Sequence, residues 1–320
     1  MRWYYLAQFT RYQKSLDKVK LHVLDKYDAL GQDDAVRRTS LLSTSKSTGP
    51  PHDAFNLSRR IDILRTASQS ALSSFLAEDD KATHYLEFPF RNFNLALIDN
   101  ASAEYSFLTT FFSPALSYPQ ITRNFNFIFE PTFALGQALT KTLVSDTYDS
   151  LGLLLCVRLN QHFAFELQRR KIPAVDSYIN LTSMTLWPRF QVIMDSHRDS
   201  LRSLTSSLST RKPSASEAAK QSAAPHFITQ RFGQFMHSIL TLSVEAGDDE
   251  PVFNSLMRLR SEVEMFLTKM SKGWEERKRE RFLYNNYSLV GTIIGDVRGD
   301  RAAEQKEHFE GLKKAFEERG

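Results

Sequence analysis

The most constraining feature of this chain is a large apolar residue at every fourth position between residues 151 and 167. This spacing places all of these residues on one face of a single helix. They are Leu151, Leu155, Leu159, Phe163 and Leu167. Around the middle of the helix nearly every other face is also apolar, which is typical of a helix enclosed by other helices. The segment therefore predicts a helix at the centre of a helical bundle.

Signals at the end of this helix predict a second one directly after it. Pro173 predicts the end of the first helix, because the residue before a proline is disfavoured in the α region. Asp176 can cap the second helix. Pro188 predicts either a kink in that helix or the start of a third one. Trp187, which precedes Pro188, is expected to be buried in the corner between helices.

Alternating steps of four and three between apolar residues predict helices elsewhere. The pattern is most regular in residues 5–30 and 252–274, where it indicates long packed helices. Pro251, with acidic residues before it, predicts the start of the second of these. Further helical patterns cover residues 55–77, 93–108, 227–244 and 298–320.

Composition supports an all-α fold, because 24 phenylalanines against 12 glycines suggest long helices with large side chains between them. The alternation in residues 124–127 leaves a short strand there as an alternative, before a helical run to Val144. Pro131 is expected to break that run or to start a turn. The predicted fold class is all-α, an elongated rod of successive antiparallel helical bundles.

The chain is expected to divide into four parts. Residues 1–30 are the end of an N-terminal coiled-coil or helical region, and residues 52–200 form a first helical bundle. Residues 201–224 are rich in serine, threonine and alanine, and are expected to be a flexible linker or loop because they cannot bury enough apolar area. Residues 225–320 form a second helical bundle. The pattern already under way at Tyr5 suggests that the natural protein extends further towards its N-terminus.

Charge and cysteine content argue against several classes of protein. The 41 basic and 37 acidic residues leave a net charge of +4, too mild to indicate nucleic-acid binding. The single cysteine, Cys156, excludes an internal disulfide framework and fits a reducing compartment. The N-terminus lacks the apolar run of a signal peptide, and no stretch approaches the ~20 apolar residues of a membrane span. A cytoplasmic location is therefore expected.

No sequence pattern indicates a reaction centre. The sequence contains no phosphate loop, dinucleotide-binding glycine pattern or nucleophile elbow. Cys156 and His162 are six positions apart and do not share a helix face, so a buried thiol is favoured over a metal ligand. Asp248, Asp249 and Glu250 lack the alternation of a calcium loop and are better explained as a helix start. We therefore expect no catalytic, cofactor-binding or metal-binding residues, and no enzymatic activity.

Two runs of basic residues need a physical explanation. Residues 169–171 lie at a predicted helix C-terminus, where positive charge suits the helix dipole. The run at residues 277–281 is denser, and Trp274 and Phe282 flank it. Interleaved glutamates favour a solvated helix face with ion pairs. The alternative is an independent helical adaptor that binds acidic membrane or nucleic acid through the 277–281 run.

Segments spread along nearly the whole chain resemble one known family. Two distinctive stretches are Glu87-Phe88-Pro89-Phe90-Arg91 and Leu186-Trp187-Pro188-Arg189-Phe190. The complete set consists of residues 87–91, 97–100, 104–105, 149–160, 169–170, 173, 176–178, 186–191, 197, 200, 225–229, 231–232 and 282–287. In this order they resemble the C-terminal portion of the vacuolar protein sorting-associated protein 52 family, subunits of the Golgi-associated retrograde protein complex. Tyr284 and Gln234 depart from the family pattern, which has an aliphatic residue and an acid there.

The resemblance implies a specific function, which the residues alone do not indicate. It implies a non-enzymatic subunit of a vesicle-tethering complex for endosome-to-trans-Golgi retrograde transport. The implied partners are the other tethering-complex subunits, a Golgi Rab GTPase and endosomal SNAREs, with peripheral membrane association and no nucleic acid. The implied location is the cytosolic face of trans-Golgi network and endosome membranes. The family's N-terminal coiled coil, which assembles the complex, is expected to precede this chain.

Overall fold

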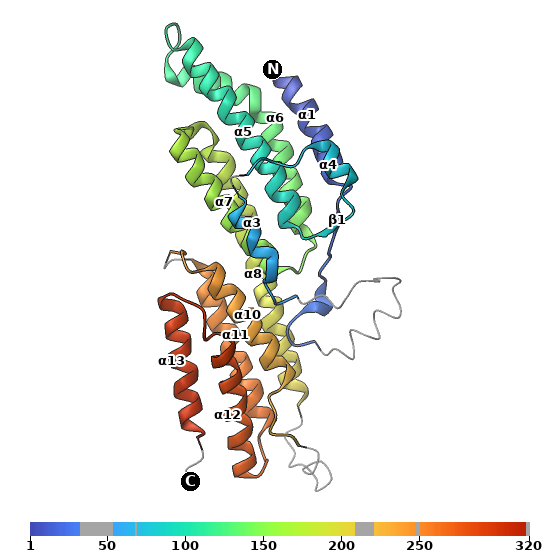
Figure 1. The fold of residues 1–320 in the computed structure, drawn as a ribbon, viewed down its shortest axis with the longest axis vertical. Coiled ribbons are helices and arrows are strands. Elements are labelled where there is room, and N and C mark those ends of the chain that lie inside the picture. Colours follow the sequence, from blue (N-terminus) through green and yellow to red (C-terminus); the bar gives the residue numbers. More distant parts are fainter. Residues whose placement is uncertain (33–53, 68, 209–220, 248–249, 318–320) are drawn as a thin grey trace. The chain divides into compact units, whose positions relative to one another are not determined.

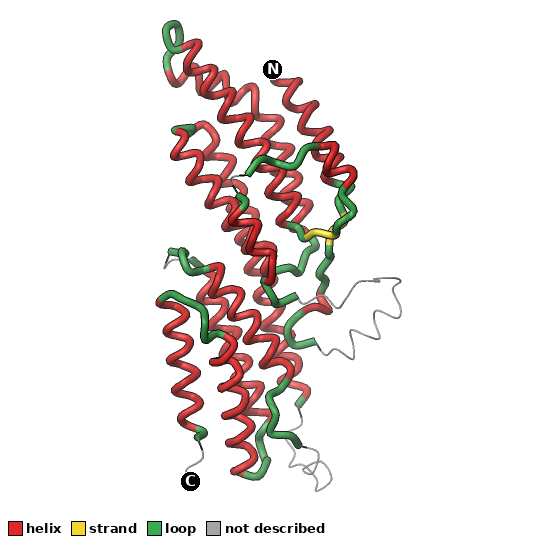
Figure 2. The backbone as a smooth tube through the Cα atoms, viewed as in Figure 1, coloured by secondary structure: helices red, strands yellow, loops and turns green. Residues whose placement is uncertain are grey.

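The computed structural model describes residues 1–32, 54–67, 69–208, 221–247 and 250–317 (Figure 1). Most of these residues are helical and very few are in strands (Figure 2), which confirms the predicted all-α class. The described strands are β1 (Lys20–Leu21) and β2 (Thr83–His84), which form a short parallel pair. The elongation of the rod stays a prediction.

Packing groups the chain into two compact units. The first contains Met1–Val23 and Arg59–Phe190, and the second contains Leu24–Ser58 and Gln191–Gly320. The predicted division into residues 1–30, 52–200, 201–224 and 225–320 stays a prediction about domains. Within the described residues, however, the segment around Leu24 to Leu30 packs with the C-terminal helices.

The first unit is a bundle of helices with an aromatic core. Its helices are α1 (Arg2–Leu16), α3 (Asp62–Arg65), α4 (Ser74–Asp79), α5 (Glu87–Phe112), α6 (Tyr118–Ser145), α7 (Ser150–Arg170) and the part of α8 (Asp176–Ser207) that ends at Phe190. Helices α5 and α6 form an antiparallel hairpin, and α1 lies along α6 (Figure 1). Phe125 and Phe129 of α6 stack at 4.9 Å, and Tyr5 of α1 lies 4.6 Å from the Phe129 ring.

Helix α7 confirms the predicted central helix, because all five residues of the apolar ridge are buried. It ends at Arg170, as predicted, and Lys171 adopts a left-handed conformation with φ of 60°. The Ile172 amide then donates to the Leu167 carbonyl at 2.9 Å, a usual way to satisfy the last turn of a helix. Helix α8 begins at Asp176. Asp176 is the first helical residue, with φ of −55° and ψ of −40°, and not the cap that was predicted.

Two predicted helices are wrong over part of their length. The helix predicted for residues 5–30 ends at Leu16, and Asp25 and Asp28 instead form a capping box around a short 3₁₀ helix. The helix predicted for residues 55–77 is likewise broken into short pieces. There Arg91 of α5 donates hydrogen bonds to the carbonyls of Thr66 and Gln69. The Gln69 amide also donates to the Thr66 carbonyl, at 2.9 Å, which is the three-residue spacing of a turn. Arg91 therefore binds a turn that interrupts the predicted helix.

Neither proline inside a predicted helix ends it. Residues 124–127 lie in α6, so the alternative of a strand is wrong, and α6 continues through Pro131. Buried residues before and after Pro131, Phe129 and Thr132, hold α6 against the core. Pro188 similarly lies inside α8. Trp187 is only half-buried and meets Phe190 edge-on at 6.0 Å, so its predicted burial is wrong.

The described part of the second unit contains the remainder of α8 and further α-helices towards the C-terminus. These are α10 (Phe227–Leu242), α11 (Pro251–Met270), α12 (Glu276–Ile293) and α13 (Asp300–Ala315). Helix α11 begins at Pro251, as predicted. Helix α8 runs to Ser207, which corrects the first residues of the predicted 201–224 linker. Residues 209–220, like Asp248 and Asp249, lie outside the described residues.

A short segment before residue 33 packs closely on α8 in the second unit. The Leu30 amide donates to His197 Nδ1 at 3.3 Å, and the Gly31 amide donates to Ser200 Oγ at 3.0 Å. A Cβ at Gly31 would lie 2.6 Å from the Ser200 carbonyl carbon. Glycine is therefore required here for close backbone approach. Arg231 of α10 fixes the segment further, donating to the Gln32 carbonyl at 2.7 Å.

The aromatic core of the first unit predicts a contrast between two phenylalanines of α6. Phe129 is fully buried, whereas Phe127 is 62% exposed. Phe129→Ala should lower the free energy of unfolding by ~3–5 kcal/mol, because it removes a large side chain and leaves a cavity. Phe127→Ala should change it by less than ~1 kcal/mol. Urea unfolding followed by circular dichroism measures both, and equal effects would contradict the described packing.

Candidate functional site: a buried arginine junction and a basic helix start

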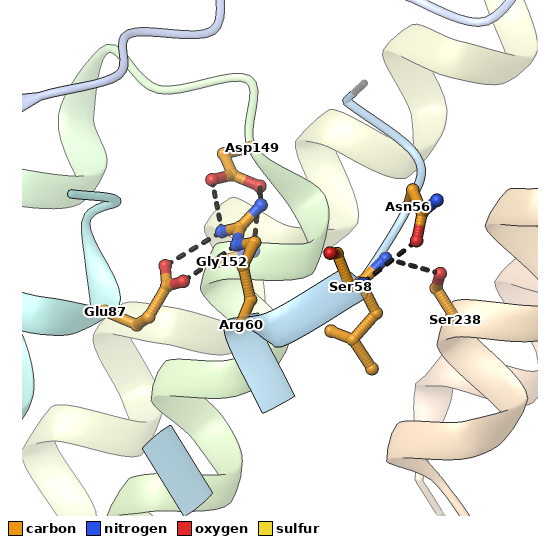
Figure 3. Close-up of polar contacts among 8 residues, drawn as sticks. Asn56, Ser58, Arg60, Glu87, Asp149, Gly152 and Ser238 are labelled. Atoms are coloured by element: carbon orange, nitrogen blue, oxygen red, sulfur yellow. Dashed lines mark hydrogen bonds and ion pairs between the residues drawn. The ribbon is translucent and has the colours of Figure 1, made fainter. Parts of the chain in front are cut away.

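Arg60 lies at the centre of a buried ionic cluster in the first unit, which we call the Arg60 junction (Figure 3). Its Nε and Nη2 donate to Oε1 and Oε2 of Glu87, each at 2.8 Å. Its Nη1 and Nη2 donate to Oδ1 and Oδ2 of Asp149, at 3.2 and 2.6 Å. One guanidinium therefore binds two carboxylates bidentately, an arrangement that fixes direction as well as distance.

The local sequence of each segment positions these three side chains. Glu87 is in the first turn of α5, and Asp149 is the N-cap of α7, where its Oδ1 accepts from the Gly152 amide at 2.8 Å. A Cβ at Gly152 would lie 2.7 Å from Arg60 Nη2, so a larger residue would displace the guanidinium. The Tyr85 ring covers the other side, 3.8 Å from the Arg60 Cζ.

The Arg60 junction holds one cation and two anions, and the positive ends of two helices offset its excess negative charge. Each acid lies at a helix N-terminus, which carries roughly half a positive charge. Burial alone would lower the pKa of Arg60, but the charges of Asp149 and Glu87 outweigh burial and raise it. Burial raises the pKa of Glu87, and Arg60 opposes this shift. The cation therefore stays charged, and both carboxylates are fully engaged.

The junction can join segments but cannot meet a substrate, because its side chains are buried. The exposed fractions are 6% for Arg60, 4% for Glu87 and 2% for Asp149. Sequence reasoning missed it, although Glu87 and Asp149 lie in family-like segments. The available signal was Arg60 itself, a charge beside the apolar pattern of Leu57, Ile61 and Leu64.

Cys156 lies one turn beyond Gly152 and is fully buried, as predicted. Burial raises the pKa of its thiol, and the nearby carboxylates of Glu87 and Asp149 add to the shift. The thiol is therefore protonated and shielded from reagents. His162, the other residue weighed as a metal ligand, is half-buried on α7. Within the described residues, no three histidine, cysteine or acidic side chains form a cluster that could hold a metal ion.

The basic run at residues 277–281 lies in the first turns of α12. Arg277 is exposed and Lys278 is half-buried, and both have partners within the chain. Arg279 lines an open groove of about 980 Å³ together with Trp274. Glu264 and Glu276 line the same groove, so the surface carries both signs of charge. This arrangement matches a helix face with ion pairs better than a uniform cationic patch.

None of the helices in the described ranges combines the length and the apolar character that crossing a bilayer requires.

These features define an all-helical protein whose buried charges hold its own segments together. The chain matches the family described as Vps52, C-terminal, over residues 1–319, and it belongs to this family. No solved structure matches the chain.

Curated relatives agree with this assignment. The chain is 33% identical to vacuolar protein sorting-associated protein 52 of Saccharomyces cerevisiae, over 91% of this chain and 50% of that protein. It is 32% identical to the Schizosaccharomyces pombe protein of the same name, over 98% of this chain and 59% of that protein. The chain is 30% identical to vacuolar protein sorting-associated protein 52 A of Arabidopsis thaliana, over 97% of this chain and 41% of that protein. The chain thus spans about half the length of these relatives.

The Arg60 junction predicts a large effect of removing its cation. Arg60→Met leaves two buried carboxylates without their partner, which should cost ~3–5 kcal/mol of the free energy of unfolding. The control is Arg65→Met, because Arg65 pairs with Asp62 on the surface, where the two side chains are 78% and 51% exposed. Its effect should stay below ~1 kcal/mol.

The same variant predicts a dependence on pH. Without Arg60, the folded-state pKa of Glu87 rises further above its unfolded value. The folded state then binds more protons than the unfolded state, so stability falls as pH rises. The loss caused by Arg60→Met should therefore be smaller at about pH 5 than at about pH 7. Urea unfolding at both pH values measures this loss of stability. An equal loss at the two pH values would contradict the conclusion that Arg60 neutralises buried carboxylates.

Proposed function

We propose that this chain is part of a non-enzymatic subunit of a vesicle-tethering complex, acting in retrograde transport from endosomes to the trans-Golgi network. The observation that carries this proposal is the match to the Vps52 C-terminal family across residues 1–319. The relatives' names refer to vacuolar protein sorting. These names support a role in protein sorting, and tethering in the retrograde direction is the further content of the proposal.

The described fold is compatible with a scaffold. Its buried ionisable groups are used within the protein, as the Arg60 junction and the Cys156 thiol illustrate. Its helices leave several large apolar side chains on the surface, including Phe107, Phe111 and Phe165. Exposed apolar surface of this kind marks contact with partners rather than chemistry.

The proposed partners are the other subunits of the tethering complex, a Golgi Rab GTPase and endosomal SNAREs. The proposed location is the cytosolic face of trans-Golgi network and endosome membranes. The relatives are about twice as long as this chain, so a large part of their sequence has no counterpart in it. Coiled-coil assembly needs several successive heptads of apolar residues. We place subunit assembly in that additional length, and Rab or SNARE contact in the helical units described here.

The alternative of an adaptor that acts through residues 277–281 has less support. Arg277 and Lys278 already have partners within the chain, and Glu276 lies beside them. Binding through such a run to acidic lipid or nucleic acid would weaken steeply as salt is raised. A steep salt dependence would therefore favour the adaptor.

A capture experiment tests the proposal. This chain and an N-terminally extended version are each used to capture proteins from cytosol of the source cells. The extended version should capture the partner subunits in stoichiometric amounts, and this chain alone should not. Rab or SNARE contact should be retained by both. Stoichiometric capture of the subunits by this chain alone would contradict the assembly part, and failure of both versions would contradict tethering.

A further inference from the structure

The α5–α6 hairpin ends in a cluster of aromatic side chains, which we call the aromatic tip. It consists of Phe107, Phe111, Phe112 and Tyr118. Phe107 is 56% exposed, and Phe111 and Tyr118 are each 65% exposed. The Phe107 and Phe111 rings stack at 5.6 Å, and Phe112 meets Phe111 edge-on at 4.9 Å. The three phenylalanines therefore form one continuous apolar surface, and Tyr118 adds a further exposed ring at the start of α6.

The charge of the hairpin end differs from that of the rest of the chain. Overall, 24% of the residues are charged, but between Tyr105 and Phe129 the only charged residue is Arg123. Arg123 is exposed. The surface therefore carries one positive charge and no carboxylate that an anionic surface would repel. Its remaining polar side chains are uncharged hydroxyls and amides.

Backbone groups at the tip already have hydrogen-bond partners. The amides of Ala115 and Leu116 both donate to the Phe112 carbonyl, at 2.9 and 2.8 Å. The Ser117 amide donates to Gln120 Oε1 at 2.9 Å, which caps the start of α6. Pro119 has no amide hydrogen. Moving this turn out of water therefore leaves few unsatisfied backbone donors.

We propose that the aromatic tip inserts into the interfacial region of a lipid bilayer. The tip is the end of a helical hairpin (Figure 1), a shape that can enter a bilayer surface. Aromatic rings, and tyrosine with its polar hydroxyl, favour the headgroup region of a membrane. The lack of carboxylates fits the anionic surface of a cytoplasmic leaflet. The proposal rests on the proposed function only for its cellular setting, because lipid vesicles alone can test it.

Vesicle flotation with the full chain tests the insertion. The chain is mixed with vesicles of phosphatidylcholine containing phosphatidylserine, and the bound fraction is measured. A triple variant carries Phe107→Ser, Phe111→Ser and Tyr118→Ser, which change only exposed side chains. It should bind at least tenfold more weakly than the unmodified chain, with an unchanged thermal midpoint. Binding of the unmodified chain should fall little as salt is raised, because apolar insertion dominates.

A matched control removes the same number of exposed apolar side chains elsewhere in the first unit. Phe75, Leu76 and Phe165 are 72%, 54% and 62% exposed. Their triple replacement by serine should leave vesicle binding within twofold of the unmodified chain. An equal loss in both triple variants would overturn the assignment to the aromatic tip. Failure of the unmodified chain to bind any vesicle would overturn the proposal itself.

A labelled cysteine reports the depth of the tip directly. The only native cysteine, Cys156, is buried, so an exposed Ser113→Cys can be labelled selectively. An environment-sensitive fluorophore there should shift to shorter wavelength when the vesicles are added. The same label at Ser145→Cys, at the other end of α6, should not shift. A shift at Ser145→Cys alone, or at neither position, would contradict insertion of the tip.

The lipid proposal and the tethering proposal fail separately. Vesicle binding without capture of subunits by the extended chain would refute tethering and keep the lipid contact. Capture of subunits without vesicle binding would refute only the lipid contact. If the tip variants lose a protein partner and the unmodified chain binds no vesicle, the tip is a protein-docking surface and the lipid proposal is wrong.

Discussion

A guanidinium held between two carboxylates joins three segments of the first unit that are far apart in the sequence. Arg60 binds Glu87 at the start of α5 and Asp149 at the start of α7, separated from it by 27 and 89 residues. Each acid also lies at a helix N-terminus, where the helix dipole stabilises negative charge. An apolar replacement of all three would avoid the cost of desolvation, but it would not impose the directions of bidentate bonds. The junction therefore fixes how α5 and α7 begin relative to the segment that carries Arg60.

Sequence patterns predicted correctly those helices whose first and last residues are determined by neighbouring residues in the sequence. The apolar ridge of α7 and the start of α11 at Pro251 were correct, because spacing and capping decide them. The predictions were wrong where contacts with residues far away in the sequence determine where a helix ends. Arg91 of α5 binds the carbonyls of a turn that interrupts the helix predicted across residues 55–77, and packing on both sides of Pro131 carries α6 through it. No local pattern contains either interaction.

The candidate sites could be predicted only in part for the same reason. Burial of Cys156 followed from the apolar surroundings of α7, whereas the Arg60 junction required three segments to meet. Family resemblance identified several segments that turned out to be structural, including those of Glu87 and Asp149. Function itself is supported by the family match and not by any reaction centre. The aromatic tip could be recognised only from the exposed fractions of its side chains in the structure. In the sequence, phenylalanines are more often core residues than contact residues.

If the Arg60 junction holds the first unit together, its three segments open as one cooperative unit. Native-state amide hydrogen exchange, followed by mass spectrometry at increasing urea concentrations, measures the opening of each segment separately. Peptides around Arg60, the first turn of α5 and the first turn of α7 should lose protection together, with the same dependence on urea. Exchange of the Arg60 peptide at much lower urea than the other two would contradict the claim, because the guanidinium would then not link them.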